Sequence, residues 1–497
     1  MKYKVILIFL LLINCKVNLF LRAQQVNTLY FMEDVPVRHF LNPAFQPTAG
    51  FYLSLPVVGF TQLNMGNNSF SLKDLVYKDI NRQTVSFLSP TGNIPHFYNT
   101  IKSNILINND LQTNLLSIGF RDESAYWTFS LTEKIQSSVN LPKELFQISL
   151  LGNLSSINNT YDFTNFDGDV SLYSEFALGY SKQMNEKWKI GGKLKLLVGA
   201  ANLCNSNNQM TLKAGVEKWT LKGEGNVNYS GPAQISSTDN YQTYSILTPD
   251  KFADWINPSG AGAGIDVGFE YHLNEKVKLS GAINDLGFIR WTNNAHSYTY
   301  GVDYTFNGIK SLNNNASSNA FQDVYDQLIM NNQLIDSITT AFNSAISSKI
   351  VPVSYTTYTT AKINIGFEYT ILQDKLSFGL LSYARLYKNN ILEELTGSVN
   401  SRPLSWMNAT LSYSLFNGRM SSIGAGIAIK SGIFNWFLAA DYIPFEKSTL
   451  LLSDLNAGYP KTKIPIPYNT KCMNLSLGIN LVFDNEVKSN RGLVRNR

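Results

Sequence analysis

The side chains that could do chemistry are few and far apart in this sequence of 497 residues. No two of its four histidines have the spacing of a metal site, and neither of the hydrolase motifs GxSxG and HExxH occurs. The glycines of 260–264 lack the GxGxxG spacing of a nucleotide site, and the acidic stretch 162–169 does not match a calcium loop. The sequence therefore predicts no catalytic residues, no cofactor and no metal. A hydrolase whose active site is assembled from residues far apart in the sequence is a minor alternative, because such a site leaves no local motif.

Charged residues are also sparse. Only 15% of the residues are charged, against about 25% in an average soluble domain. A hydrophobic share of 44% excludes a disordered chain. The net charge is +5, and four of the basic residues precede residue 24, so the remaining chain is close to neutral. This balance argues against a nucleic-acid partner, which a basic surface would hold.

Residues 1–23 have the organisation of a secretory signal peptide. Two lysines precede an apolar run over 5–13, and Ala23 offers a cleavage site. The run is too short for a permanent membrane helix. Lipidation of Cys15 is the alternative, and it is disfavoured because Asn14 stands where a small residue is wanted. We expect export across the inner membrane and cleavage after Ala23.

The dominant pattern beyond this segment is an alternation of apolar and polar residues. It is clearest over 219–229, 265–271, 362–369 and 408–415. Successive side chains of a strand leave on opposite faces, so each segment has one apolar and one polar face. No apolar run of about 18 residues, the length of a membrane helix, follows the signal segment, so helices that cross a membrane are not expected.

Several of the expected strands form hairpins that share one kind of turn. Short polar turns lie at 185–187, 274–276 and 373–375, and a fourth hairpin turns at the Asn-Gly pair 417–418. Other connections are long and rich in Asn, Ser and Gly, as in 199–210, 230–263 and 311–320. Short turns on one side and long loops on the other are typical of outer-membrane barrels.

Aromatic residues and the C-terminal strand also favour a membrane barrel. Trp188, Trp291 and Trp406 lie near strand ends, which suits the aromatic girdles at membrane interfaces. Residues 474–483 alternate and end in an aromatic residue, the usual form of the last strand of an outer-membrane protein. The sequence therefore predicts an all-β fold, a closed antiparallel transmembrane barrel of about 14 strands over 51–483. A secreted soluble sandwich or propeller is the alternative.

In such a barrel the apolar faces contact lipid and the polar faces look into the lumen, because a closed sheet pairs every backbone polar group. Charges of both signs are expected to line the lumen: Glu175, Lys193, Lys195, Lys222, Glu224, Asp266, Glu270, Lys362 and Glu368. They could border a watery path, or they could pair with one another and fill the lumen. The sequence leaves both interpretations open.

Three segments depart from the strand pattern. Apolar residues recur every three or four positions over 319–348, which predicts an amphipathic helical insertion on a side of the membrane that strand counting does not fix. The mature start, 24–50, contains three prolines between residues 35 and 47, and proline interrupts both helices and strands. We expect an irregular segment folded into or beneath the barrel, as a possible plug. Residues 484–497 are expected to form a polar tail.

Short motifs in the mature chain resemble a known group of barrels. The sequence LNPAF at 41–45 resembles the N-terminal NPA element of the fatty-acid transporter-like (FadL-like) outer-membrane barrels. More closely, 27–45, 262–271 with 280–291, and 364–383 resemble an uncharacterised Bacteroidota-type family in that group. The chain lacks the longer N-terminal helical hatch of the fatty-acid transporters. The resemblance implies a lumen plugged through the motif Asn42, Pro43, Ala44 and Phe45.

The pattern and the resemblance together indicate an integral outer-membrane protein that is surrounded by lipid. We expect a passive channel or transporter for a small or hydrophobic solute, with a continuous lumen or a lateral opening. The resemblance also implies an alternative, a scaffold or anchor for a surface secretion or gliding complex with periplasmic or secreted protein partners.

Two cysteines remain after the signal segment, Cys204 and Cys472, and they form no CxxC pair. Cys204 follows the strand that leaves the turn at 185–187, and Cys472 precedes the terminal strand. Both are therefore expected at the extracellular end, where a disulfide between them is possible. Two separate thiols are the alternative.

Overall fold

The computed structural model describes most of the expected barrel. The signal segment 1–23 and the tail 484–497 lie outside the described residues. So does 319–345 of the expected helix, whereas its last residues, 346–348, begin strand β16 (Ile346–Pro352) and are not helical. The described residues are 27–78, 84–89, 92–151, 159–215, 218–238, 243–247, 257–306, 346–387, 390–416, 419–441, 447–451, 463–467 and 471–483.

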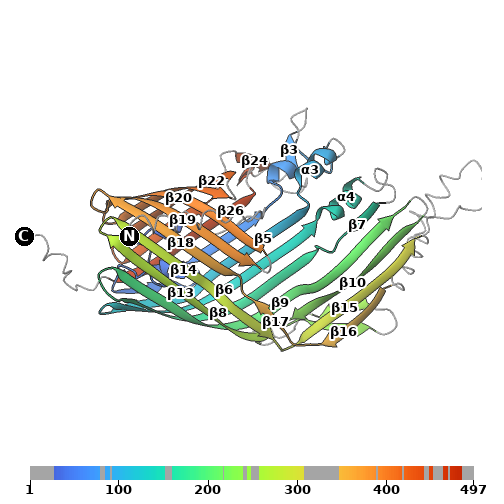
Figure 1. The fold of residues 1–497 in the computed structure, drawn as a ribbon, viewed down its shortest axis with the longest axis horizontal. Helices are drawn as coiled ribbons and strands as arrows, with labels where there is room; N and C mark the ends of the chain where they lie inside the picture. The colour runs from blue at the N-terminus through green and yellow to red at the C-terminus, as the bar shows by residue number, and fades with distance from the viewer. Residues whose placement is uncertain are drawn as a thin grey trace, which may run out of the picture.

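Fourteen antiparallel strand positions close into one barrel (Figure 1). The first position is shared by β1 (Phe51–Ser54) and β2 (Thr61–Asn67), which pair with the last strand on one side and with β5 on the other. The predicted closed barrel is confirmed. The other positions follow in ring order: β5 (Asn104–Asp122), β6 (Ala125–Pro142), β8 (Asp167–Gln183), β9 (Trp188–Ala214), β13 (Gly260–Asn274), β14 (Val277–Trp291), β18 (Ala361–Ile371), β19 (Leu376–Tyr387), β20 (Asn390–Leu404), β21 (Met407–Phe416), β22 (Arg419–Ser431), β23 (Phe434–Asp441) and β26 (Cys472–Phe483).

The two ends of the barrel differ. One end, here called the short-turn end, carries the tight hairpins, including the predicted turns 185–187, 274–276 and 373–375. The opposite loop end carries the long connections (Figure 1). The pair 417–418 lies outside the described residues, but Phe416 and Arg419 pair beside it, at the loop end. The loop-end elements are α2 (Leu72–Leu75), β3 (Val76–Lys78), β4 (Thr84–Ser86), α3 (Ile94–Thr100), α4 (Lys143–Leu151), β11 (Gln234–Thr238), β12 (Thr243–Leu247), β17 (Tyr355–Tyr358), β24 (Lys447–Leu451) and β25 (Lys463–Pro467).

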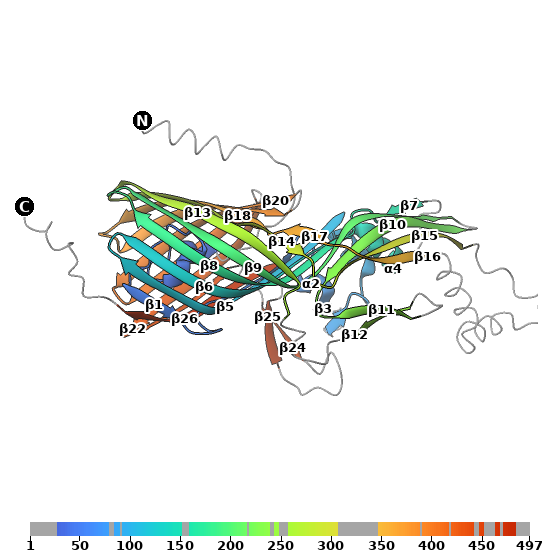
Figure 2. The same cartoon turned by 90° about the horizontal axis from the view of Figure 1, so that it is seen from below.

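A small sheet extends the barrel at the loop end. Strand β9 has 27 residues and runs past the rim, where β7 (Asn159–Asp162) and β10 (Trp219–Ser230) pair with it. Strand β15 (Ala295–Phe306) adds to β10, and β16 adds to β15. Figures 1 and 2 both show this extension beyond the ring. The predicted strand 219–229 is therefore present, but outside the barrel.

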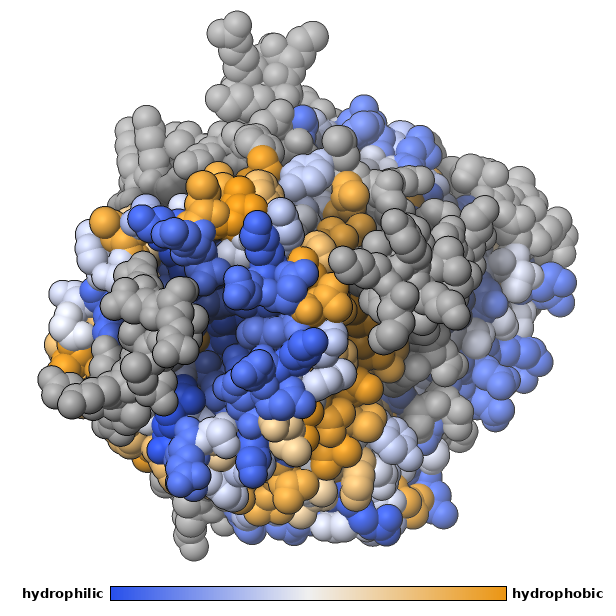
Figure 3. All heavy atoms as spheres, turned by 60° about the vertical axis from the view of Figure 1, so that its left-hand side comes forward, coloured by the Kyte–Doolittle hydropathy of each residue, from blue (hydrophilic) through white to orange (hydrophobic). Residues whose placement is uncertain are grey.

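The outer wall is apolar and the inner wall is polar, as the alternation predicts. On β9, Leu194 is 69% exposed, whereas Lys193 and Lys195 beside it are 3% and 7% exposed. Figure 3 shows a hydrophobic band next to a hydrophilic, hollowed mouth at the short-turn end. A closed sheet with such a belt is suited to lipid, and the protein is an outer-membrane-type β-barrel. The belt includes Phe129, Phe176, Leu178, Ile190, Leu196, Val267, Phe269, Phe378, Leu411, Trp436 and Leu438. No helix in the described part of the chain is long and apolar enough to span a bilayer.

The tryptophans fit the expected girdle only in part. Trp188 and Trp406 are exposed at the short-turn end. Trp291 is instead fully buried, and its indole N–H donates to Thr357 Oγ1 at 2.8 Å. It fits because Gly199 of β9, on the far side of β13, has no side chain: a Cβ there would overlap the Trp291 ring. For Trp291 the prediction of an interfacial position was wrong.

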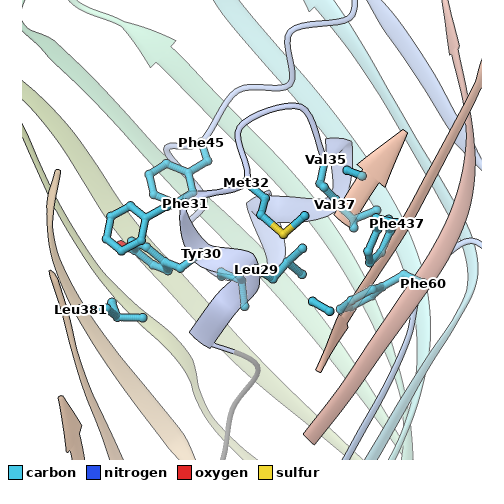
Figure 4. Packing of buried hydrophobic residues seen from close by; sticks show 13 residues of the cluster. Leu29, Tyr30, Phe31, Met32, Val35, Val37, Phe45, Phe60, Leu381 and Phe437 are labelled. Carbon is cyan, nitrogen blue, oxygen red and sulfur yellow. The ribbon is translucent and has the colours of Figure 1, made fainter. Parts of the chain in front are cut away.

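The N-terminal segment 27–50 lies inside the barrel (Figure 4). It contains two short 3-10 helices, η1 (Asn27–Phe31) and η2 (Pro36–Phe40), and is otherwise irregular. Its apolar side chains pack on one another and on a few apolar wall residues, which makes a dry cluster in an otherwise polar lumen. The cluster includes Leu29, Tyr30, Phe31, Met32, Val35, Val37, Leu41 and Phe45 of the segment and Phe60, Leu381 and Phe437 of the wall.

Candidate functional site

The NPA motif anchors the N-terminal segment to the wall. The Ala44 N–H donates to Asn42 Oδ1 at 2.9 Å, which closes a local turn. The Asn42 amide nitrogen donates to the carbonyls of Phe269 on β13 and Gly281 on β14, at 3.2 and 3.3 Å. Asparagine suits this place because it can close its own turn and still donate outward. Asn42 thus joins the segment to two neighbouring strands.

Two wall amides hold the residue before this motif. Asn284 on β14 and Asn364 on β18 both donate from their side chains to the Leu41 carbonyl, at 2.7 and 2.9 Å. All three residues are buried. A buried carbonyl without a partner would be costly, so these amides satisfy an otherwise unpaired group and fix the depth of the segment in the lumen.

A buried ion network lies on the inner wall and centres on Asp285 of β14. Asp285 Oδ1 is 2.9 Å from Lys134 Nζ and 2.6 Å from Lys195 Nζ, and Oδ2 is 2.9 Å from Lys362 Nζ. These lysines come from β6, β9 and β18. This one carboxylate therefore links its own strand, β14, to three others.

Two further carboxylates complete the network. Glu175 lies 2.7 Å from Lys134 Nζ and 3.3 Å from Lys195 Nζ, and Asp266 lies 2.8 Å from Lys195 Nζ. With Asp285 and Lys362, the network holds three lysines and three carboxylates, so the charges balance. In this structure these groups pair with one another on the inner wall of the barrel.

A second group of ion pairs joins the N-terminal segment to the short-turn end. Glu33 pairs with Lys278 of β14 and lies 2.5 Å from Arg402 of β20. Lys278 also lies 3.6 Å from Glu368. Burial would raise the pKa of the Glu33 carboxyl, but Lys278 and Arg402 hold that pKa well below its usual range. Glu33 therefore stays ionised and ties the segment to two distant strands.

His39 is a buried titratable residue of the N-terminal segment. Its Nε2 lies 2.5 Å from the Tyr52 hydroxyl, and its Nδ1 has no partner within the described chain. Burial, together with the positive charges of Lys193 and Lys195, holds the pKa of His39 well below its ordinary value. The imidazole is thus neutral while the segment is in place.

The structure brings together most of the charges that the sequence assigned to the lumen. Glu175, Lys195, Asp266 and Lys362 join the Asp285 network. Lys193 lies 4.5 Å from the Phe40 ring centre. Glu368 pairs with Lys278, and Glu270 lies 2.8 Å from Lys189 Nζ near the short-turn end.

Lys222 and Glu224 do not join them. Both are exposed on β10, in the sheet beyond the rim, where Lys222 Nζ lies 2.9 Å from Asp303. The prediction that Lys222 and Glu224 line the lumen was wrong, because an alternating strand has the same sequence pattern in the barrel and in a sheet that extends beyond it.

Several residues of the site were missed. Lys134 stands at a polar position of a run, 125–142, whose alternation could have revealed it. Asp285 gives no such signal. It follows Asn284 at a register irregularity between β13 and β14, and its positive φ of 59° turns the carboxylate inward, out of the two-residue period.

Two cavities lie toward the two ends of the barrel, and the N-terminal segment lines the first of them. The mouth cavity, at the short-turn end, has a volume of about 870 Å³ and is lined by Glu33, Arg38, Phe45, Lys276 and Arg402, among others. The rim cavity, toward the loop end, has a volume of about 590 Å³. Aromatic, hydroxyl and amide side chains line it together with two carboxylates, and the lining includes Phe166, Asp167, Asp169, Asn208, Asn228, Tyr355, Thr357 and Tyr358.

The two cysteines do not form the possible disulfide. Each is a buried thiol, Cys204 on β9 and Cys472 at the start of β26. Both lie toward the loop end, and Cys204 lines the rim cavity. Within the described chain, no group of three or more histidine, cysteine or acidic residues is arranged to hold a metal ion.

Comparisons with known proteins place the chain in a family. No curated protein sequence matches it. Among solved structures it is similar to the toluene transporter TodX of P. putida (9% identity, 90% of this chain and 93% of that chain, TM-score 0.38). It is also similar to the toluene transporter TbuX of Ralstonia pickettii (8%, 90% and 94%, 0.41) and to a FadL homologue of Pseudomonas aeruginosa (11%, 94% and 100%, 0.37). The model described as "Family of unknown function (DUF5723)" matches residues 43–441, and the chain belongs to this family.

Proposed function

We propose that the protein is a gated channel of the outer membrane, closed by its own N-terminal segment. The observation that supports this proposal lies along one strand, β18. Thr370 lines the mouth cavity, Asn364 holds the Leu41 carbonyl of the segment, and Thr360 next to the strand lines the rim cavity. The segment therefore lies between the mouth cavity and the loop end, where the rim cavity is, and the Lys362–Asp285 pair lies between the segment and the rim cavity.

The way in which the segment is held supports a gate. The backbone–backbone hydrogen bonds of residues 29–45 run within the segment, for example from the Leu41 N–H to the Arg38 carbonyl at 2.8 Å. Contacts with the wall are made through side chains such as Asn42, Asn284 and Glu33. Side-chain bonds can exchange one by one with water, whereas leaving a sheet breaks a whole ladder. The segment can therefore shift while the ring stays closed.

The rim cavity indicates the class of solute. Its volume lies within the range of about 300–1,000 Å³ that is usual for small-molecule sites. Phe166, Tyr355 and Tyr358 offer apolar surface, and threonines and asparagines offer uncharged hydrogen-bonding groups. Asp167 and Asp169 also line the cavity and would repel an anion. We infer a small, largely apolar solute.

A cysteine lock tests the gate. Thr28 Oγ1 of the segment lies 2.6 Å from Ser412 Oγ of the wall, so Thr28→Cys with Ser412→Cys is close enough for a disulfide. Uptake of the apolar fluorescent dye N-phenylnaphthylamine is measured in cells with an intact outer membrane that make the protein. Oxidation should abolish the protein-dependent uptake, and a reductant should restore it.

A wall-to-wall pair serves as the control. Thr61 Oγ1 on β2 and Thr113 Oγ1 on β5 lie 3.5 Å apart, and a disulfide between cysteines at these positions leaves the segment free. Uptake that continues unchanged through the oxidised Thr28–Ser412 lock would contradict the gate.

The extension beyond the rim favours a second function, a scaffold for a surface complex. Strands β10, β15 and β16 present exposed polar side chains, including the Lys222–Asp303 pair. A scaffold should co-purify with secreted or periplasmic proteins after gentle solubilisation. If the protein is recovered alone, this function fails and the channel is unaffected.

A further inference from the structure

Arg38 is a buried cation that the described chain leaves without an ion pair. Its Nε–H donates to the Tyr30 carbonyl at 2.9 Å, and its guanidinium carbon lies 4.3 Å from the centre of the Phe45 ring. The residue is only 8% exposed. A charge removed from water is costly unless an opposite charge or several hydrogen bonds replace the water.

Three carboxylates lie near enough to interact with the charge of Arg38: Glu33, Asp34 and Glu368. Glu33 and Glu368 are engaged elsewhere. Glu33 pairs with Lys278 and Arg402, and Glu368 pairs with Lys278. Within the described residues, no carboxylate lies within ion-pair distance of Arg38. Lys193 is similar in this respect, but it does not line the mouth cavity, whereas Arg38 does.

The remaining donors of Arg38 can serve a ligand in that cavity. Because Nε is bound to the Tyr30 carbonyl, the two terminal nitrogens are the part of the planar fork that is left. The cavity has a volume of about 870 Å³ and opens at the hydrophilic mouth of the short-turn end (Figure 3). Phe45, under the guanidinium, also lines it.

We propose that the mouth cavity binds a small carboxylate monoanion, held by the two terminal nitrogens of Arg38 and packed beside Phe45. A guanidinium fork matches the two oxygens of a carboxylate. A single charge is favoured because the five cations of the lining (Arg38, Lys189, Lys276, Lys278 and Arg402) exceed its four carboxylates (Glu33, Glu270, Glu275 and Asp374) by one. Phe45 favours a ligand with an apolar body. This site is independent of the channel, because binding at the mouth requires no passage through the lumen.

Calorimetric titration of the full chain, in a detergent with an uncharged headgroup at pH 7, tests the site. Benzoate is the probe, and benzamide is its neutral counterpart of similar shape. Benzoate should bind the unaltered protein at least about tenfold more tightly than benzamide, since a charge-assisted pair contributes more than a neutral hydrogen bond. Arg38→Gln should remove this preference, and Arg38→Lys, which keeps the charge but loses the fork, should retain only part of it.

Lys276→Gln is the matched control, because Lys276 is an exposed cation that lines the same cavity. It should change benzoate binding by less than about twofold. Unchanged binding in Arg38→Gln, equal losses in both variants, or equal binding of benzamide and benzoate would each overturn the proposal. Barrel folding of each variant is checked by its faster migration on unboiled gels. Dye uptake is scored separately, so loss of benzoate binding with normal uptake rejects the site and leaves the channel standing.

Discussion

Gly191 of β9 and Gly268 of β13 lie opposite each other in the barrel wall, and the NPA motif occupies the space that their missing side chains leave. A Cβ on Gly191 would lie 2.7 Å from the Ala44 nitrogen, and one on Gly268 would lie 2.9 Å from Pro43 Cδ and overlap Asn42 Oδ1. The motif and the two glycines therefore form one joint, in which no side chain projects from the wall at the place where the segment turns.

Gly268→Val should displace the N-terminal segment. The added side chain overlaps Asn42, and overpacking of this kind costs about 1–3 kcal/mol. We expect increased dye uptake and an increased conductance in planar bilayers. Gly397→Val on β20 is the control, since a Cβ there meets nothing within 4 Å. Equal conductance in the two variants would show that the joint does not hold the gate.

Asp285→Asn should destabilise the barrel strongly. It leaves Lys134, Lys195 and Lys362 with one carboxylate fewer in a buried setting, and breaking a buried ion pair costs about 3–5 kcal/mol. The temperature at which the faster-migrating folded form disappears from unboiled gels should fall markedly. Lys222→Gln breaks a pair whose side chains are 62% and 67% exposed and should cost at most about 1 kcal/mol. Similar melting of both variants would contradict the central role of Asp285.

Docking of the N-terminal segment should weaken in acid because of His39. The pKa of His39 in the docked state is held well below the ordinary value, which is about 6.5. As the pH falls, His39 of a released segment is therefore protonated at a higher pH than His39 of a docked segment. The docked form is therefore fully favoured above that ordinary pKa and loses up to about 1.4 kcal/mol for each pH unit below it. Between pH 7.5 and 5.5, dye uptake should rise in the unaltered protein.

His39→Gln should remove most of this pH dependence. Glu33, whose pKa is held well below its usual range, does not titrate between these pH values. Burial raises the pKa of Asp34, which favours docking in acid and so acts in the opposite direction. Because both carboxyls are present in both proteins, the difference between the two pH profiles reports His39 alone. Identical profiles would contradict its role.

The barrel could be predicted because its strands and tight turns depend on residues that are close together in the sequence. Lys193, Leu194 and Lys195 show it in three residues: a two-residue period that sends lysines inward and a leucine outward. The turns that precede Trp188, Val277 and Leu376 were visible for the same reason. The alternation indicates which face of the sheet each side chain occupies, and the tight turns indicate which strands are neighbours.

What could not be predicted depends on contacts between distant strands. Trp291 turns inward because Gly199 makes room for it, and no local pattern contains that fact. Strand β10 alternates like the barrel strands, yet it adds to the part of β9 that runs past the rim. The prolines of the N-terminal segment indicated an irregular course. The roles of Arg38 and Glu33 could not be predicted, because they depend on the cavity and on the wall residues around them.

The seam of the ring constrains the order of assembly. Phe51, at the beginning of the barrel sequence, pairs with Phe483 at its end, so the cylinder cannot shut until the final strand arrives. The interior segment is translated before all of these strands, and its apolar residues are enclosed on every side once the seam has formed. We therefore expect the strands to curl around a segment that is already present, with the seam as the late, long-range step of folding.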